Sequence, residues 1–152
     1  MAIPVVTLLI TSSLIGLQLF LTFQVIRRRR QSKVAIGTAD SDELSRAVRA
    51  HGNFTEVTPI FLISLLILEL VDSYLWWVAI LGILFIAGRI LHAWSILVVE
   101  ARRGSYSLRV TGMMLTVIPL AMSAISGVVW VVWNLSELCP VGAEPASLAS
   151  KM

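Results

Sequence analysis

Charged residues are scarce in this sequence. They make up 14% of the chain, whereas hydrophobic residues make up 57%. A soluble domain is about a quarter charged, and its apolar residues recur in short periodic groups rather than in long blocks. Here the apolar residues do form long blocks with almost no charge in them. The composition therefore excludes an ordinary water-soluble fold and favours an integral membrane protein.

The sequence also has few residues of the types that form disulfides or bind metals. Cys139 is the only cysteine, which excludes an intramolecular disulfide and a cysteine-ligated metal site. The two histidines, His51 and His92, belong to different apolar segments and have no carboxylate grouping beside them. The sequence therefore predicts no metal site of the zinc or di-iron type.

Four apolar segments are each long enough to cross a membrane. A helix needs about 20 residues to span a hydrocarbon core of about 30 Å. We expect helices at about 2–26, 43–70, 74–99 and 109–133. The predicted fold class is all-α, an integral membrane four-helix bundle within residues 1–135, followed by a flexible tail at 136–152.

Two kinds of residue are expected to shape these helices. Asp42 is a candidate N-cap of the second helix, since its carboxylate can accept from free backbone N–H groups. Small residues let membrane helices approach each other closely. The glycines expected to serve this purpose are Gly82, Gly88, Gly112 and Gly127.

Basic residues gather at two of the connections. Four consecutive arginines and Lys33 follow the first apolar segment, and Arg102 and Arg103 precede the fourth. The positive-inside rule then places the first and third connections in the cytoplasm and both termini outside. The net charge of +3 thus marks topology rather than nucleic-acid binding. The arginine row is also suited to attract anionic lipid of the bilayer.

Polar side chains at the start of the second helix are spaced for one helical face. Arg46, Arg49, Asn53 and Glu56 lie three or four residues apart. Arg46 is explained well enough by snorkelling to the membrane surface. Asn53 and Glu56 lie deeper, before a run that is expected to be wholly apolar, and such residues usually mark a substrate or ion path. His51 stands about 200° around the helix from Arg49, so it aims elsewhere, and a neighbouring subunit is one possible target.

The third segment carries two polar residues one turn apart, Arg89 and His92. An unpaired arginine in the apolar body of a membrane helix costs several kcal/mol by most estimates, so Arg89 should face either Glu56 or a ligand anion. A purely structural bridge from Arg89 to Glu56 remains an equal alternative. Arg109, by position alone, is an ordinary topological charge.

These residues together resemble a known family. The run Arg49-Ala50-His51-x-Asn53-x-x-Glu56 followed by Pro59, with a later Gly88-Arg89-x-x-His92, resembles the MAPEG family, the membrane-associated proteins in eicosanoid and glutathione metabolism. The likeness extends over about residues 5–133 and is greatest to small bacterial members. It implies a homotrimer in a bacterial inner membrane that binds glutathione as co-substrate between adjacent subunits, near the cytoplasmic surface.

The resemblance also implies roles for individual residues. Arg49, Asn53 and Glu56 would hold the glutathione peptide, with Arg49 on a carboxylate and Glu56 on the ammonium group. His51 would reach the site from the adjacent subunit.

Further residues complete the implied site. Arg89 and His92 would line the same pocket, and Arg29 or Arg30 would add a cation from a neighbour. Arg109 would lie beside the thiol as the catalytic arginine.

Three functions remain open at this point. The resemblance implies a glutathione-dependent transferase or peroxidase acting on lipophilic electrophiles. Val57 and Ile96, however, stand where several enzymatic members have tyrosines, and the family includes a non-catalytic lipid-binding member, so a lipid- or thiol-binding protein is the second candidate. The third is a small proton-coupled exporter that uses Glu56, although the adjacent Arg49 favours a permanently ionised carboxylate.

Overall fold

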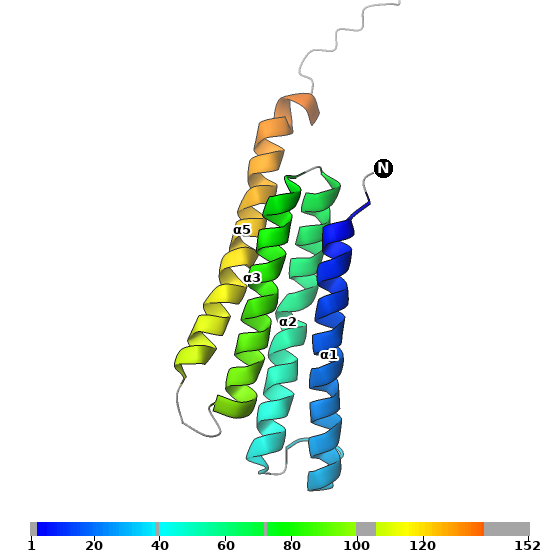
Figure 1. Ribbon diagram of the computed structural model, residues 1–152, viewed down its shortest axis with the longest axis vertical. Coiled ribbons are helices and arrows are strands. Elements are labelled where there is room, and N and C mark those ends of the chain that lie inside the picture. The colour runs from blue at the N-terminus through cyan, green and yellow to red at the C-terminus, as the bar shows by residue number, and fades with distance from the viewer. Residues whose placement is uncertain (1–2, 39, 72, 100–105, 139–152) are drawn as a thin grey trace, which may run out of the picture.

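The computed structural model describes residues 3–38, 40–71, 73–99 and 106–138. The described elements are α1 (Val5–Ser32), α2 (Asp42–Leu70), α3 (Leu75–Trp94), the π-helical segment η1 (Ser95–Val99) and α5 (Ser107–Leu138). The helices stand side by side, and α5 projects beyond the others at one end (Figure 1). Within the described residues, four spans are long and apolar enough to cross a membrane. The predicted all-α membrane bundle is confirmed, while the homotrimer stays a prediction.

Helix ends differ from the expected positions at both sides of the first connection. α1 continues past residue 26 through the arginine row to Ser32, because arginine is a good helix former, and it ends where Lys33 adopts a left-handed conformation (φ 52°). Ser41, not Asp42, caps α2: its Oγ accepts from the N–H of Leu44 at 3.4 Å. Asp42 occupies the first turn instead, where its charge complements the helix dipole.

The other predicted boundaries are also shifted. α3 ends at Trp94 and its last expected turn is the π-helical η1. α5 begins at Ser107 and continues to Leu138, so the predicted tail at 136–152 starts inside a helix. Residues 139–152 lie outside the described part of the chain.

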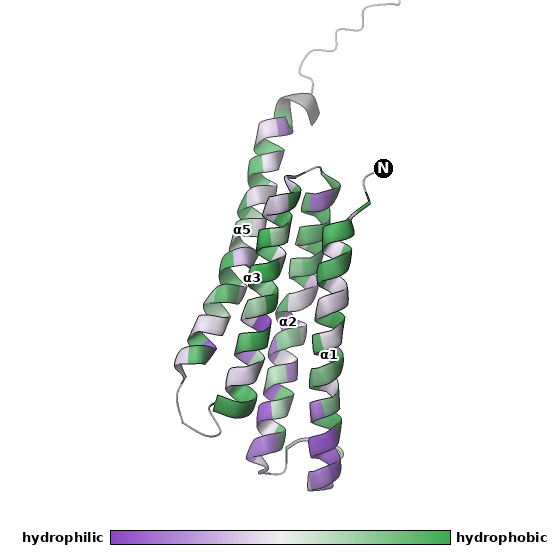
Figure 2. Ribbon diagram, viewed as in Figure 1, coloured by the Kyte–Doolittle hydropathy of each residue, from purple (hydrophilic) through white to green (hydrophobic). Residues whose placement is uncertain are grey.

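Polar residues concentrate at one end of the bundle. Figure 2 shows hydrophilic colour over the lower parts of α1 and α2, at the end where the connection between them lies. The opposite end is mostly apolar. Two tryptophans form hydrogen bonds between helices there: Trp77 Nε1 donates to Ser126 Oγ at 3.0 Å, and Trp130 Nε1 donates to the Val71 carbonyl oxygen at 3.2 Å. The polar end is therefore the one expected to face the cytoplasm.

Close backbone contact joins α3 to α5. A Cβ built on Gly88 would lie 2.7 Å from the backbone carbon of Leu115, and one built on Gly112 would lie 2.6 Å from the backbone nitrogen of His92. Because any side chain larger than hydrogen would collide there, glycine is required at both positions. Gly82 similarly admits the side chain of Ile10 from α1. Gly127 makes no such contact within the single chain, since no described atom lies within 4 Å of a Cβ there.

The apolar run expected after Glu56 contains one buried carboxylate, Glu69, which is 3% exposed. Its two oxygens accept from the backbone N–H groups of Val6 at 2.9 Å and Thr7 at 2.6 Å. These N–H groups belong to the first turn of α1 and have no partner within their own helix. Glu69 therefore caps α1 from α2 and complements its dipole, which explains a carboxylate at that depth without any ligand.

The glycine contact makes a direct stability prediction. Gly112→Ala should lower the free energy of unfolding by about 1–3 kcal/mol, because the methyl group meets backbone atoms that cannot rotate away. Gly127→Ala is the matched control in the same helix and should leave stability unchanged or slightly raised. Thermal unfolding in detergent, followed by circular dichroism, measures both. Equal melting temperatures for the two variants would contradict the described packing.

The Glu69 cap makes a second prediction. Glu69→Ala should cost about 1–3 kcal/mol of stability, because two backbone donors lose their acceptor. The amides of Val6 and Thr7 should exchange with deuterium faster, while those in the middle of α1 should not. Glu56→Ala, in the same helix but with no hydrogen bond or ion pair to the described residues of α1, serves as control. Unchanged exchange at the start of α1 in the Glu69 variant would rule out the capping role.

Candidate functional site

α2 carries a polar ladder, the side chains of Arg49, Asn53 and Glu56. This ladder lies partly on the outside and partly on the inside of the bundle. Arg49 and Glu56, two turns apart, are exposed in the isolated chain, and Asn53 between them is half-buried. The same uncovered face continues toward the other end through Ile60, which is 56% exposed, and Ile63, which is 55% exposed. One face of α2 therefore presents charges at its polar end and apolar side chains beyond them.

Asn53 connects this face to α3 and α5. Its Nδ2 lies 3.1 Å from His92 Nε2, and His92 Nδ1 lies 3.3 Å from the Arg109 carbonyl oxygen. An amide nitrogen only donates and a carbonyl oxygen only accepts. His92 Nε2 must then be the acceptor and Nδ1 must carry the proton, so neutral imidazole with the proton on Nδ1 satisfies both bonds.

Arg89 lies behind the ladder with part of its hydrogen-bonding capacity unused. The residue is 3% exposed, and its Nε and Nη2 have no hydrogen-bond partner among the described residues. The guanidinium carbon is 5.6 Å from the centre of the Phe54 ring, a cation–π distance. Glu56 attracts it electrostatically, but the described residues include no Arg89–Glu56 ion pair. The structural bridge left open by the sequence is therefore not formed in the isolated chain.

His51 points away from this group, as its helical angle indicates. Its Nε2 lies 3.0 Å from Gln18 Nε2 and 3.2 Å from Thr22 Oγ1, both on α1 of the same chain. The side chain is thus held inside its own bundle on the side facing α1. Its contribution to a site in an adjacent subunit stays a prediction.

The basic residues of α1 also lie apart from the ladder. Arg29 donates to the carbonyl oxygens of Ala35 and Gly37, each at 3.1 Å, and so holds the first connection in place. Arg30 is exposed. The structure therefore joins Asn53, His92 and Arg109 by hydrogen bonds, and it does not bring Arg29 or Arg30 to them within one chain.

The π-helical segment η1 was not predicted from the sequence. It begins at Ser95, one turn after His92, and the Ser95 side chain is fully buried with no described partner for its hydroxyl. Such widened turns occur frequently at functional sites. Ile96, where several MAPEG enzymes have a tyrosine, is 2% exposed within this segment. The position therefore supplies no hydroxyl and is used for packing.

The comparison with protein families decides the relationship that the motif suggests. The MAPEG family profile matches residues 7–129. This chain belongs to the MAPEG family. All candidate residues from Arg29 to Arg109 lie within the matched region.

Two similar proteins come from Escherichia coli. The inner membrane protein YecN of strain K12 is 32% identical over 114 residues, which cover 75% of this chain and 83% of YecN. YecN of strain O6:H1 (CFT073) matches with the same identity and coverage. The recognised family is thus confirmed by a profile and by relatives of similar length.

The hydrogen-bond chain through His92 predicts an observable tautomer. In protein with labelled histidine, nitrogen NMR at neutral pH should show His92 uncharged with its proton on Nδ1. Asn53→Leu should change the Nε2 signal strongly and the Nδ1 signal weakly, because only the first loses its partner. His51, bonded to α1, is the internal control and should not respond. A proton on Nε2 of His92 in the unmodified protein would contradict the described geometry.

Proposed function

We propose that this protein is a glutathione-dependent transferase or peroxidase of a bacterial inner membrane, acting on lipophilic electrophiles. The observation that carries the proposal is the set on one side of α2: exposed Arg49 and Glu56, buried Arg89 with unused donors, and Asn53 linked to Arg109. Family membership supports it. The inner membrane location is supported by the four spans and by the name of the relative YecN.

Glutathione fits these side chains by charge. The peptide carries two carboxylates, an ammonium group and a thiol, and charge-assisted hydrogen bonds are the strong ones. Arg49 is suited to one carboxylate, and Glu56 to the ammonium group. Asn53 has an amide oxygen for a peptide N–H, since its Nδ2 is engaged by His92. The donors of Arg89 that are unused in the isolated chain would support Glu56 or the peptide.

The exposure of these charges supports association of subunits, as in the homotrimer that the resemblance implies. A charged side chain facing hydrocarbon costs several kcal/mol by most estimates, and such residues normally face protein or a water-filled recess. Arg49 and Glu56 are uncovered in the single chain. We therefore infer that a second subunit covers this face and that glutathione lies in the recess between the two, reached from the cytoplasm if the first and third connections lie there.

Arg109 would supply the chemistry. A thiol with an ordinary pKa of about 8.5 is mostly protonated at neutral pH, and an adjacent guanidinium favours the thiolate by about 1.4 kcal/mol per unit of pKa depression. Arginine stays charged even when partly desolvated. In transfer, the thiolate sulfur attacks the electrophilic carbon, the leaving group departs with the bonding electrons, and the thiol proton goes to water. His92 would position Arg109 through its backbone carbonyl.

One observation favours the second candidate, a lipid- or thiol-binding protein without catalysis. Val57 and Ile96 stand at the positions that the resemblance compares with tyrosines, and neither side chain has a hydroxyl group; Ile96 is buried and Val57 is half-buried. The two candidates share the pocket and differ only in turnover.

Substitutions of Glu56 and Arg109 test the proposal. Glu56→Gln should weaken glutathione binding by about tenfold, the loss of one charge-assisted bond. Arg109→Ala should leave binding largely intact, but should reduce the thiolate absorbance of bound glutathione and its conjugation to a chlorinated nitroaromatic by at least about tenfold. Calorimetry and ultraviolet spectroscopy on detergent-purified protein measure these effects.

Glu43→Gln is the matched control on α2, since Glu43 pairs with Arg28 away from the ladder. It should bind glutathione normally. Binding without turnover of either the nitroaromatic or a lipid hydroperoxide would select the non-catalytic candidate. If the unmodified protein neither binds glutathione nor turns over either substrate, the proposed enzyme and a thiol-binding protein are both refuted.

A further inference from the structure

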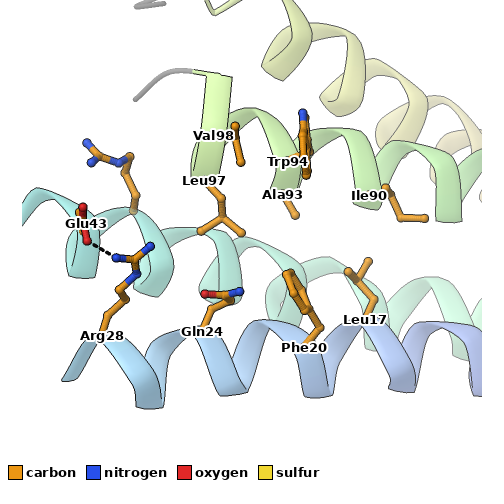
Figure 3. A pocket seen from close by; sticks show the side chains of 11 residues that line it. Leu17, Phe20, Gln24, Arg28, Glu43, Ile90, Ala93, Trp94, Leu97 and Val98 are labelled. Atoms are coloured by element: carbon orange, nitrogen blue, oxygen red, sulfur yellow. Dashed lines mark hydrogen bonds and ion pairs between the residues drawn. The ribbon is translucent and has the colours of Figure 1, made fainter. Parts of the chain in front are cut away.

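A cavity of about 540 Å³ lies between α1 and α3 at the polar end of the bundle. Figure 3 shows Leu17 and Phe20 of α1 on one side and Ile90 and Trp94 of α3 on the other, with Arg28 and Glu43 at one end. The cavity shares Arg46 with the polar side chains at the start of α2, but its described lining includes none of Arg49, Asn53 and Glu56.

The polar end of this cavity carries one uncompensated positive charge. Arg28 forms an ion pair with Glu43, which joins α1 to the first turn of α2. Arg46 also lines the cavity, and among the described residues it has neither an ion pair nor a hydrogen bond. Snorkelling alone explains why Arg46 lies near the membrane surface but not why it borders a cavity. A single anionic group placed between Arg46 and the Arg28–Glu43 pair would complete the local charge balance.

Apart from Gln24 of α1, the remainder of the cavity is lined by apolar side chains, and it is open to the side. Phe20 is 50% exposed, Ile90 is 52% exposed and Trp94 is 57% exposed, and Leu97 of η1 completes the wall. Water is held in a protein cavity only where polar partners are available, and these side chains offer almost none. At membrane depth such a space is filled by hydrocarbon. Its volume is within the range of pockets that hold small molecules.

We propose that this cavity binds one anionic phospholipid, with the phosphate on Arg46 and an acyl chain between Phe20 and Trp94. The cytoplasmic leaflet is rich in anionic lipid, and the basic end of the bundle is the end expected to lie there. Inorganic phosphate shares the headgroup chemistry but has no chain to occupy the apolar part. The cavity therefore discriminates by both charge and hydrocarbon, and this binding is independent of glutathione.

Native mass spectrometry of the full-length protein tests the proposal. The protein in detergent is titrated with phosphatidylglycerol or with phosphatidylcholine of the same acyl chains. We expect one tightly retained phosphatidylglycerol per subunit and about tenfold weaker retention of phosphatidylcholine. An excess of inorganic phosphate should not displace the lipid. Displacement by phosphate, or equal retention of the two lipids, would overturn the proposal.

Two variants place the lipid in this cavity. Arg46→Gln should weaken phosphatidylglycerol retention about tenfold, whereas the control Arg49→Gln, one turn away on the uncovered face, should not. Leu97→Trp should weaken retention by narrowing the apolar part of the cavity without altering charge. Circular dichroism confirms folding of each variant. Equal losses in the Arg46 and Arg49 variants would show general attraction to the basic end, and unchanged retention in the Leu97 variant would show binding elsewhere; either result overturns the assignment.

Discussion

The backbone contact between α3 and α5 determines the geometry of the candidate site. Gly112 allows α5 to touch the backbone of α3 at His92, and Gly88 allows the reciprocal approach one turn earlier. At this separation the His92 ring reaches the Arg109 carbonyl oxygen while its other nitrogen meets Asn53. Because the ring can satisfy both neighbours in only one neutral form, packing between two helices also specifies the polar link to a third. The charged residues of α2 and the start of α5 are thereby held in a fixed relation.

Polar groups deep in an apolar bundle are informative because each needs a partner. Glu69 has its partners in two N–H groups of α1, and its role is complete within the chain. Arg89 is buried to the same degree, yet two of its nitrogens have no described partner. The first is explained by folding alone. The second leaves unused donors near Glu56, and this difference separates a structural carboxylate from the buried arginine of the proposed site.

Much of the fold was predictable from composition, because a bilayer demands long uncharged helices and the sequence has four of them. The spacing of Arg49, Asn53 and Glu56 predicted one side of α2, and in the structure Arg49 and Glu56 are exposed while Asn53 reaches His92 of α3. The helical angle of His51 correctly turned it away from Arg49, but periodicity does not say which element it meets, and the structure shows α1 of its own chain. Glu69 was missed because a single carboxylate at the end of an apolar run looks like a helix terminus until its partners are known.

The π-helical turn at Ser95 was not predictable either, since one inserted residue leaves no mark on hydropathy. Nor does the sequence of one chain show what covers the exposed face of α2. On that face, two charged side chains and several isoleucines of the same membrane helix are uncovered in the single chain. A second subunit that leaves a polar recess at the charges would remove the cost of exposing them to lipid, whereas the exposed isoleucines are compatible with hydrocarbon as they stand.

The most direct measurement is an experimental structure of the assembled protein with glutathione in a lipid environment. The account predicts the peptide between two subunits, with one carboxylate on Arg49, the ammonium group on Glu56 and the sulfur near Arg109. A structure in which Arg49 and Glu56 face lipid, or are sealed together with no recess open to the polar end of the bundle, would contradict it.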